Sequence, residues 1–153
     1  MKTIVLFILL VANLLAYSKG ELISDEMAKH LGLKDSKIYI IDFFASWCSS
    51  CQKEIPLMSK LNTKLDKSKI EIIGIDVDKD VQKGLEFQAS LKEKGDLNFR
   101  VVNDPQNLVI SKFNPIGMPT LYYVKDKKVL GIVTGAVDNI DEKIMNDLEK
   151  WSK

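Results

Sequence analysis

An apolar segment that runs directly into a Cys-x-x-Cys motif constrains the fold of this chain more than any other feature. Residues 40–47 are mostly aliphatic or aromatic, and Cys48 and Cys51, the only two cysteines of the 153 residues, follow at once. A disulfide between positions i and i+3 closes a very short loop, and short loops gain the least from loop-closure entropy. A structural disulfide at this spacing would therefore add little stability, and the pair is predicted to serve reversible redox chemistry.

Strand and helix patterns alternate along the chain. Strands are expected at 38–44, 70–77, 98–102, 120–124 and 128–134, and helices at 25–31, 49–66, 81–94, 105–113 and 140–151. The run at 38–44 is almost continuously apolar, which is typical of a central strand buried on both faces. Asp104 is the expected cap of the helix at 105–113, and the last two strands are expected to form a hairpin. This order predicts an α/β fold.

The length and the charge restrict the kind of protein. A chain of 153 residues with 46% apolar side chains suffices for one compact domain and is too short for two. The formal net charge is +1, and no run of Lys and Arg stands out, so we expect no nucleic-acid partner. One Cys-x-x-Cys pair cannot complete a tetrahedral zinc site, and His30, the only histidine, is expected at a surface or a helix end. We expect a monomer without metal or bound cofactor.

The N-terminal residues have the layout of an export signal. Residues 4–16 form an apolar block that follows Lys2 and precedes small residues, and Ala16-Tyr17-Ser18 offers a cleavage site. The block is shorter than the roughly 20 residues of a membrane-spanning helix. We therefore predict a signal peptide at 1–18, a domain at 19–153 and a periplasmic location, where the compartment is oxidising. The alternative is an uncleaved N-terminal anchor at the outer face of the inner membrane.

The two cysteines have different expected roles. Cys48 lies where a strand ends and a helix begins, so that unpaired backbone amides and the helix dipole stabilise its thiolate. Cys48 is therefore the candidate nucleophile. Cys51 lies one turn deeper and is placed to resolve a mixed disulfide by attacking Cys48. Trp47 is expected to flank the reactive sulfur as part of a substrate platform, with packing against the core as the alternative.

The chain resembles the thioredoxin superfamily. The resemblance rests on residues 42–51, on Pro56 in the following helix and on Gly117-Met118-Pro119-Thr120 before the predicted hairpin, and it covers roughly residues 36–151. It implies a thioredoxin fold, with a central mixed sheet flanked by helices. It also implies that Pro119 is a cis proline that faces the cysteines, and that Met118 offers its backbone to an extended substrate segment.

Within that superfamily, the chain resembles the TlpA/ResA/CcmG branch of periplasmic thiol reductases. The likeness rests on the export signal, on residues 51–56 and on an extra strand-helix insertion before Pro119. It implies protein substrates with disulfides, including the haem-binding cysteines of apocytochromes c, and an integral membrane electron donor of the DsbD/CcdA type. Glu54 falls where this branch has a buried active-site glutamate, which is suited to exchange a proton with Cys51.

Asp42 departs from that branch. It lies six residues before Cys48, where cytoplasmic thioredoxins have a buried aspartate and ResA-like proteins usually do not. Burial raises the pKa of a carboxyl group, so Asp42 and Glu54 would each be a useful base near neutral pH and would titrate as a coupled set. The alternative is that either side chain reaches solvent as a cap or a surface charge.

The leading hypothesis is a periplasmic thiol-disulfide reductase in which Cys48 attacks a substrate disulfide and Cys51 releases the product. A disulfide oxidase or isomerase on the same fold is the first alternative. The second is a binding module in which the thioredoxin fold holds a partner and the cysteines matter little.

Overall fold

The computed structural model describes residues 16–151. The predicted signal segment therefore lies almost entirely outside the described residues. No helix between residues 16 and 151 is both long enough and apolar enough to cross a membrane. The strands are β1 (Ile38–Phe44), β2 (Ile70–Asp76), β3 (Arg100–Asn103), β4 (Thr120–Lys125) and β5 (Lys128–Thr134). The helices are α1 (Asp25–His30), α2 (Ser49–Asn62), α3 (Val81–Glu93), α4 (Ile110–Phe113) and α5 (Ile140–Glu149).

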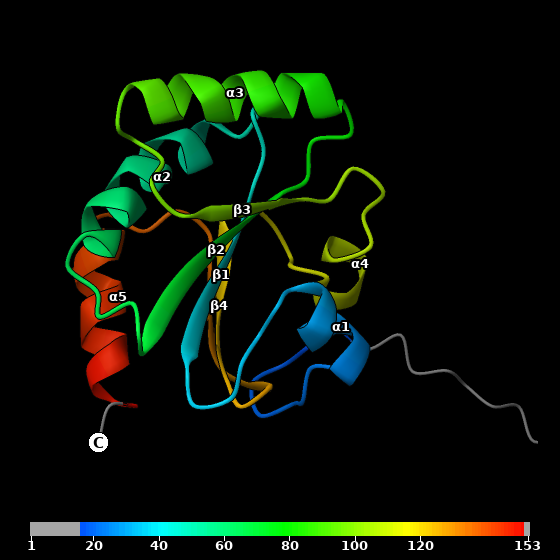
Figure 1. Cartoon of the computed structure of the whole chain (residues 1–153), viewed down its shortest axis with the longest axis vertical. Coiled ribbons are helices and arrows are strands. Elements are labelled where there is room, and N and C mark those ends of the chain that lie inside the picture. Colours follow the sequence, from blue (N-terminus) through cyan, green and yellow to red (C-terminus); the bar gives the residue numbers. More distant parts are fainter. Residues whose placement is uncertain (1–15, 152–153) are drawn as a thin grey trace, which may run out of the picture.

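A mixed sheet forms the centre of the domain. Its strand order is β3-β2-β1-β4-β5. Strands β1, β2 and β3 are parallel to one another, and β4 is antiparallel to both of its neighbours, β1 and β5. Helices α2 and α5 lie on one side of the sheet, α1 and α4 lie on the other, and α3 crosses one end (Figure 1). The predicted α/β thioredoxin fold is confirmed, and β1 is the central strand, with all seven residues buried.

The alternation of side chains along β1 divides the core into two layers. Ile40 and Phe44 face the layer that contains α2, whereas Ile41 and Phe43 face the layer that contains α1 and α4. Burial of each such side chain contributes about 1.5–3 kcal/mol to the stability of the folded state. Because Asp42 has the same parity as Ile40 and Phe44, its carboxyl group points toward α2.

Two helices are shorter than the sequence predicts by four or more residues, whereas the other three differ by one or two. Helix α2 ends at Asn62, four residues before the predicted end, because the Thr63 hydroxyl donates to the Lys60 carbonyl and the Lys67 ammonium donates to the Asn62 carbonyl. These side chains satisfy carbonyl groups that a longer helix would use. The second shorter helix is α4, which follows the predicted cap Asp104.

Asp104 does cap a helix, but across a turn. Its carboxylate accepts the N–H groups of Val109 and Ile110, and Asn107 lies in the left-handed region with a φ of 58°. Residues 105–109 therefore form turns, and α4 contains only the last four residues of the predicted helix. Short polar side chains compete in this way with regular helical hydrogen bonds.

Gly84 lets α3 pack closely against the end of β2. A Cβ atom at this position would lie 2.8 Å from Asp76 Oδ2 and 3.3 Å from Asp78 Cβ. We expect Gly84→Ala to lower the free energy of unfolding by about 1–3 kcal/mol, because overpacking outweighs the better helix propensity of alanine. Urea denaturation measures this, and Lys92→Ala, on an exposed position of α3, should change stability by less than about 0.5 kcal/mol. Equal stability of both variants would contradict a tight fit at Gly84.

Candidate active site

The candidate site lies at one edge of the sheet, where β1 ends and α2 begins. Cys48 is the N-cap residue of α2, and its N–H donates to the Ala45 carbonyl over 3.1 Å. Cys48 Sγ and Cys51 Sγ are bonded at 2.09 Å, so the structure represents the oxidised protein. The parallel strands β1, β2 and β3 all end at this edge, and the loops that follow them therefore lie close to the disulfide.

The surroundings of the two sulfur atoms differ as their expected roles require. Cys48 is 7% exposed and Cys51 is 1% exposed, so Cys48 is the more accessible of the two. The backbone N–H of Cys51 donates to Cys48 Sγ over 3.2 Å. A helix N-terminus and a direct N–H donor both favour a thiolate on Cys48 once the disulfide is reduced. The assignment of Cys48 as nucleophile and Cys51 as resolving thiol stays a prediction.

The Met118–Pro119 peptide bond is cis, as the family resemblance implies. Thr120 pairs with Phe43 of β1, which brings Pro119 to the edge of the sheet where Cys48 lies. The Pro119 carbonyl accepts the N–H of Gly135 over 2.9 Å. Between residues 16 and 151, the backbone N–H and C=O of Met118 form no hydrogen bond. This leaves the Met118 backbone able to pair with an extended segment, and its role in substrate binding stays a prediction.

Two large apolar side chains are exposed near the disulfide. Trp47, directly before Cys48, is 69% exposed, so packing against the core does not account for it. Ile116, in the loop that leads to Pro119, is 96% exposed. Ile116 is not predicted as a site residue from the sequence, because a single apolar residue in a loop has no periodic pattern around it. Its place next to Gly117-Met118-Pro119 was the available signal.

The two candidate carboxyl groups are both buried beside the disulfide. Asp42 points into the layer that contains Cys51, and Glu54 follows Cys51 by three positions, on the same face of α2. Asp42 Oδ1 has no hydrogen-bond partner among residues 16–151. The alternative that either residue is a surface charge or a cap is therefore wrong. Their role in proton transfer stays a prediction.

Burial governs the charge state of this pair. Loss of hydration raises the pKa of Asp42 well above its ordinary value, and the neighbouring charge of Glu54 raises it further. Burial raises the pKa of Glu54 to about 7. The negative charge of an ionised Glu54 therefore opposes the loss of the proton from Asp42. With a pKa of about 7, Glu54 can accept or donate a proton near neutral pH.

A cleft connects Glu54 with the surface. It has a volume of about 420 Å³, and it lies between the first turns of α2 and the loop that precedes α5. Its lining residues are Ser50, Lys53, Glu54, Leu57 and residues 136–139. Solvent in this cleft can exchange protons with Glu54, which Asp42, deeper in the core, cannot do directly. The residues at 136–139 were not foreseen from the sequence, since they reach the site only through the fold.

His30 lies in the last turn of α1 and is exposed, as predicted. Within the described chain, no three His, Cys, Asp or Glu side chains come together in a way that could hold a metal ion.

Comparisons with known proteins agree with the site. The sequence model of the thioredoxin-like family matches residues 35–128. The thiol-disulfide oxidoreductase ResA of Bacillus thuringiensis subsp. konkukian is 30% identical over 134 residues, which cover 86% of this chain and 72% of ResA. ResA of Bacillus cereus is similar to the same extent.

Solved structures share the fold. StoA from Bacillus subtilis superposes with a TM-score of 0.63 at 18% sequence identity, over 79% of this chain and 86% of StoA. A thiol-disulfide isomerase from Corynebacterium glutamicum superposes with a TM-score of 0.61 at 19% identity, over 86% of this chain and 90% of the isomerase.

Proposed function

Because the chain belongs to the thioredoxin-like family and is a thiol-disulfide oxidoreductase of the ResA type, we propose that it works as a reductase of disulfides in exported proteins. The name of the ResA relatives states the exchange reaction and leaves its direction open. The observation that carries the proposed direction is the pair of buried carboxyl groups, Asp42 and Glu54, beside Cys51.

The buried carboxyl groups favour a low reduction potential. A thiol-disulfide protein is a strong oxidant when its reduced form is stabilised, which usually means a stabilised thiolate. A carboxylate on Glu54 acts in the opposite sense, since a second negative charge on Cys51 would be repelled in a medium of low dielectric constant. This repulsion opposes the stabilisation that the N-terminus of α2 gives to the Cys48 thiolate, and it favours the transfer of electrons from the reduced pair to a substrate.

In the proposed reaction, the Cys48 thiolate attacks one sulfur of a substrate disulfide, and that S–S bond breaks. The first substrate sulfur leaves as a thiolate and takes a proton from solvent. Cys51 then transfers its proton to Glu54 and attacks Cys48 Sγ, and the second substrate sulfur leaves. The substrate gains two electrons, and the Cys48–Cys51 pair loses two in forming the disulfide that the structure contains. A dithiol donor must return these electrons.

The proposed location is the periplasm. The apolar block at 4–16 supports export, either with cleavage or as a retained anchor. In an oxidising compartment, a reductase needs a dedicated electron donor, and we assign this role to an integral membrane protein of the DsbD/CcdA type. Apocytochrome c, whose haem-binding cysteines must be reduced, is the candidate substrate.

The reduction potential of the Cys48–Cys51 pair tests the direction. We would measure it on residues 17–153 by equilibration with glutathione, and would keep Tyr17 because its ring lies 5.0 Å from that of Phe113. We expect a value near or below that of thioredoxin, about −270 mV. A value near −120 mV, at the oxidant end of the scale, would instead make the protein a disulfide-forming enzyme.

A further inference from the structure

Ser46, two residues before Cys48, has all of its polar groups bonded to other parts of the domain. The Ser46 N–H donates to Asp78 Oδ2 over 2.7 Å, and the Ser46 hydroxyl donates to Asp78 Oδ1 over 2.9 Å. The Ser46 carbonyl accepts from Gln52 Nε2 over 2.6 Å. The turn at Ser46, which belongs to neither a strand nor a helix, is thus held by Asp78 on one side and by Gln52 on the other.

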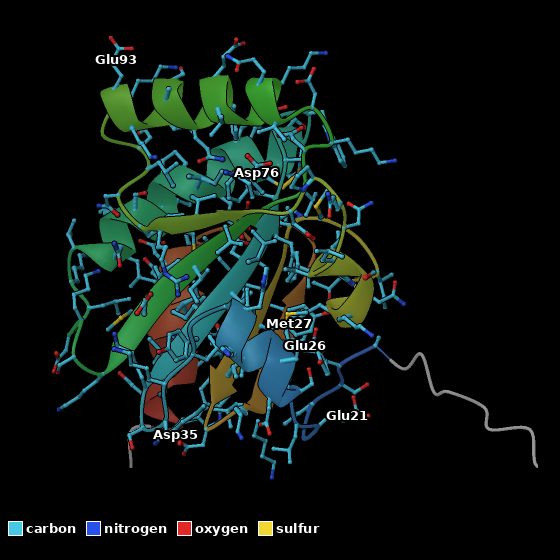
Figure 2. All side chains as sticks on the ribbon, turned by 45° about the vertical axis from the view of Figure 1, so that its right-hand side comes forward. Glu21, Glu26, Met27, Asp35, Asp76 and Glu93 are labelled. Carbon is cyan, nitrogen blue, oxygen red and sulfur yellow. A yellow bond between two sulfur atoms is a disulfide. The ribbon has the colours of Figure 1, made fainter. Side chains whose placement is uncertain are left out.

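Asp78 is itself held from behind. It is buried, and its backbone N–H donates to Asp76 Oδ1 over 2.9 Å. The other oxygen of Asp76 accepts from Gln88 Nε2 of α3 over 2.7 Å, and Gly84 of α3 packs against both aspartates. Figure 2 shows Asp76 between the end of the sheet and α3. Helix α3 therefore supports, through Asp76 and Asp78, the turn that precedes the disulfide.

We propose that Asp78 is a positioning residue for substrate docking, because through Ser46 it fixes the turn that places Trp47 beside Cys48. Trp47 is largely exposed, so few core contacts fix its ring, and its position depends on the backbone of the turn. A bidentate carboxylate that binds both the N–H and the hydroxyl of Ser46 restrains that backbone more than a single hydrogen bond does. Such restraint lowers the ordering cost of binding a peptide.

This proposal goes beyond the reductase assignment, since it needs only the exchange reaction at Cys48. The test compares Asp78→Ala, Asp78→Asn and Asp35→Ala in the full-length protein. Asparagine keeps the shape of Asp78 and can still accept the Ser46 N–H and donate to the Ser46 hydroxyl. Asp35 is an exposed aspartate at the opposite end of the sheet, so its removal is a control for the loss of one charge (Figure 2).

Two substrates separate docking from chemistry. Insulin presents its disulfides within a polypeptide, whereas oxidised glutathione is small and needs Cys48 but little of the platform. For Asp78→Ala we expect kcat/KM toward insulin to fall about tenfold, mainly through a higher KM, and the rate with oxidised glutathione to change less than about threefold. Asp78→Asn and Asp35→Ala should stay within about threefold of the wild-type protein on both substrates.

Several outcomes would overturn the proposal. Equal losses on insulin and glutathione would indicate general damage to the site, and equal losses in Asp78→Asn and Asp78→Ala would indicate that the charge, and not the geometry, matters. If Asp78→Ala does not fold, Gln52→Ala removes one bond to Ser46 from an exposed position and should show a smaller loss confined to insulin. Unchanged insulin reduction in Gln52→Ala would then refute the proposal.

Failure of the reductase assignment can be distinguished from failure of the proposal for Asp78. If the wild-type protein did not reduce insulin, that assignment would fail, and the same variants would be compared in the oxidising direction with a reduced dithiol peptide and with reduced glutathione. Selective loss on the peptide would still support Asp78 as a positioning residue. A uniform loss, or none, would refute it.

Discussion

A Cys51→Ser variant is expected to stop the exchange reaction at the mixed disulfide and to accumulate a covalent adduct with its substrate through Cys48. The reason is geometric, because Cys51 is the sulfur within bonding distance of Cys48 and is almost fully shielded from solvent. Without it, the adduct can be resolved only by an external thiol. We expect turnover to fall by about 10³-fold or more, the magnitude typical of removing a group that takes part in covalent catalysis.

The adduct is measured by non-reducing electrophoresis and mass spectrometry after incubation of the reduced variant with a disulfide-containing protein, and it should disappear on addition of excess dithiothreitol. Cys48→Ser is the matched control, since it removes the more accessible sulfur and should give neither turnover nor adduct. An adduct through Cys51 in that control would contradict the assigned roles. The binding module would be favoured if the wild-type protein had no exchange activity and a Cys48→Ser, Cys51→Ser double variant still captured a partner.

The elements that local patterns determine were predicted well. The bounds of β1 match the prediction, because an apolar run rich in β-branched and aromatic residues can only be a buried strand here. Helix α1 begins at Asp25, as predicted, and Ser24 caps it by accepting the Met27 N–H. The hairpin turn at Asp126 and Lys127 also forms, although it lacks glycine and both residues take a positive φ, of 50° and 62°.

Features that depend on contacts from outside an element could not be read from the sequence. The end of α2 is set by Lys67, which lies beyond it in the chain, and the start of α4 is set by the Asp104 carboxylate across a turn. No periodicity encodes either contact. The same holds for the support of Ser46 by Asp78, since 32 residues separate these two side chains and only the parallel pairing of β1 with β2 brings them together.

In the candidate site, too, some features could be predicted from the sequence and others could not. The Cys-x-x-Cys pair, the buried carboxyl groups and the cis proline have signals in short motifs or in the family resemblance. Ile116, Gln52 and the cleft beside Glu54 have none, because an exposed apolar residue, a glutamine in a helix and a loop are all unremarkable in sequence. Their relevance follows from where the sheet places the loops that surround Cys48.

Removal of the buried carboxyl groups should stabilise the protein and slow the reaction at the same time. In the folded state, burial raises the pKa of Glu54 from 4.5 to about 7, so between these pH values the folded protein binds more protons than the unfolded chain. The free energy of unfolding therefore falls as the pH rises through this window and levels off above it. At about 1.4 kcal/mol per pKa unit, the loss amounts to roughly 3 kcal/mol.

Glu54→Gln abolishes that loss. We expect the variant to be more stable than the wild-type protein by up to about 3 kcal/mol at pH 8 and similar to it at pH 4. Asp42→Asn should also stabilise the protein at pH 8, because burial raises the pKa of Asp42 well above its ordinary value. Asp66 provides the opposite control: hydrogen bonds from Ser68 lower its pKa, so Asp66→Asn should not stabilise the protein at any pH.

The same variants should lose activity. Without a proton acceptor for Cys51, we expect the rate of substrate release at pH 7 to fall by about 10–100-fold in Glu54→Gln, and the inflection near pH 7 in its pH–rate profile to disappear. Urea denaturation and single-turnover kinetics on the same samples measure both effects. A variant that is more stable and yet slower cannot owe its slowness to unfolding, so this combination isolates the proton-transfer role. A destabilised Glu54→Gln at pH 8, or one with the wild-type pH–rate profile, would show that Glu54 neither carries a buried charge nor serves Cys51.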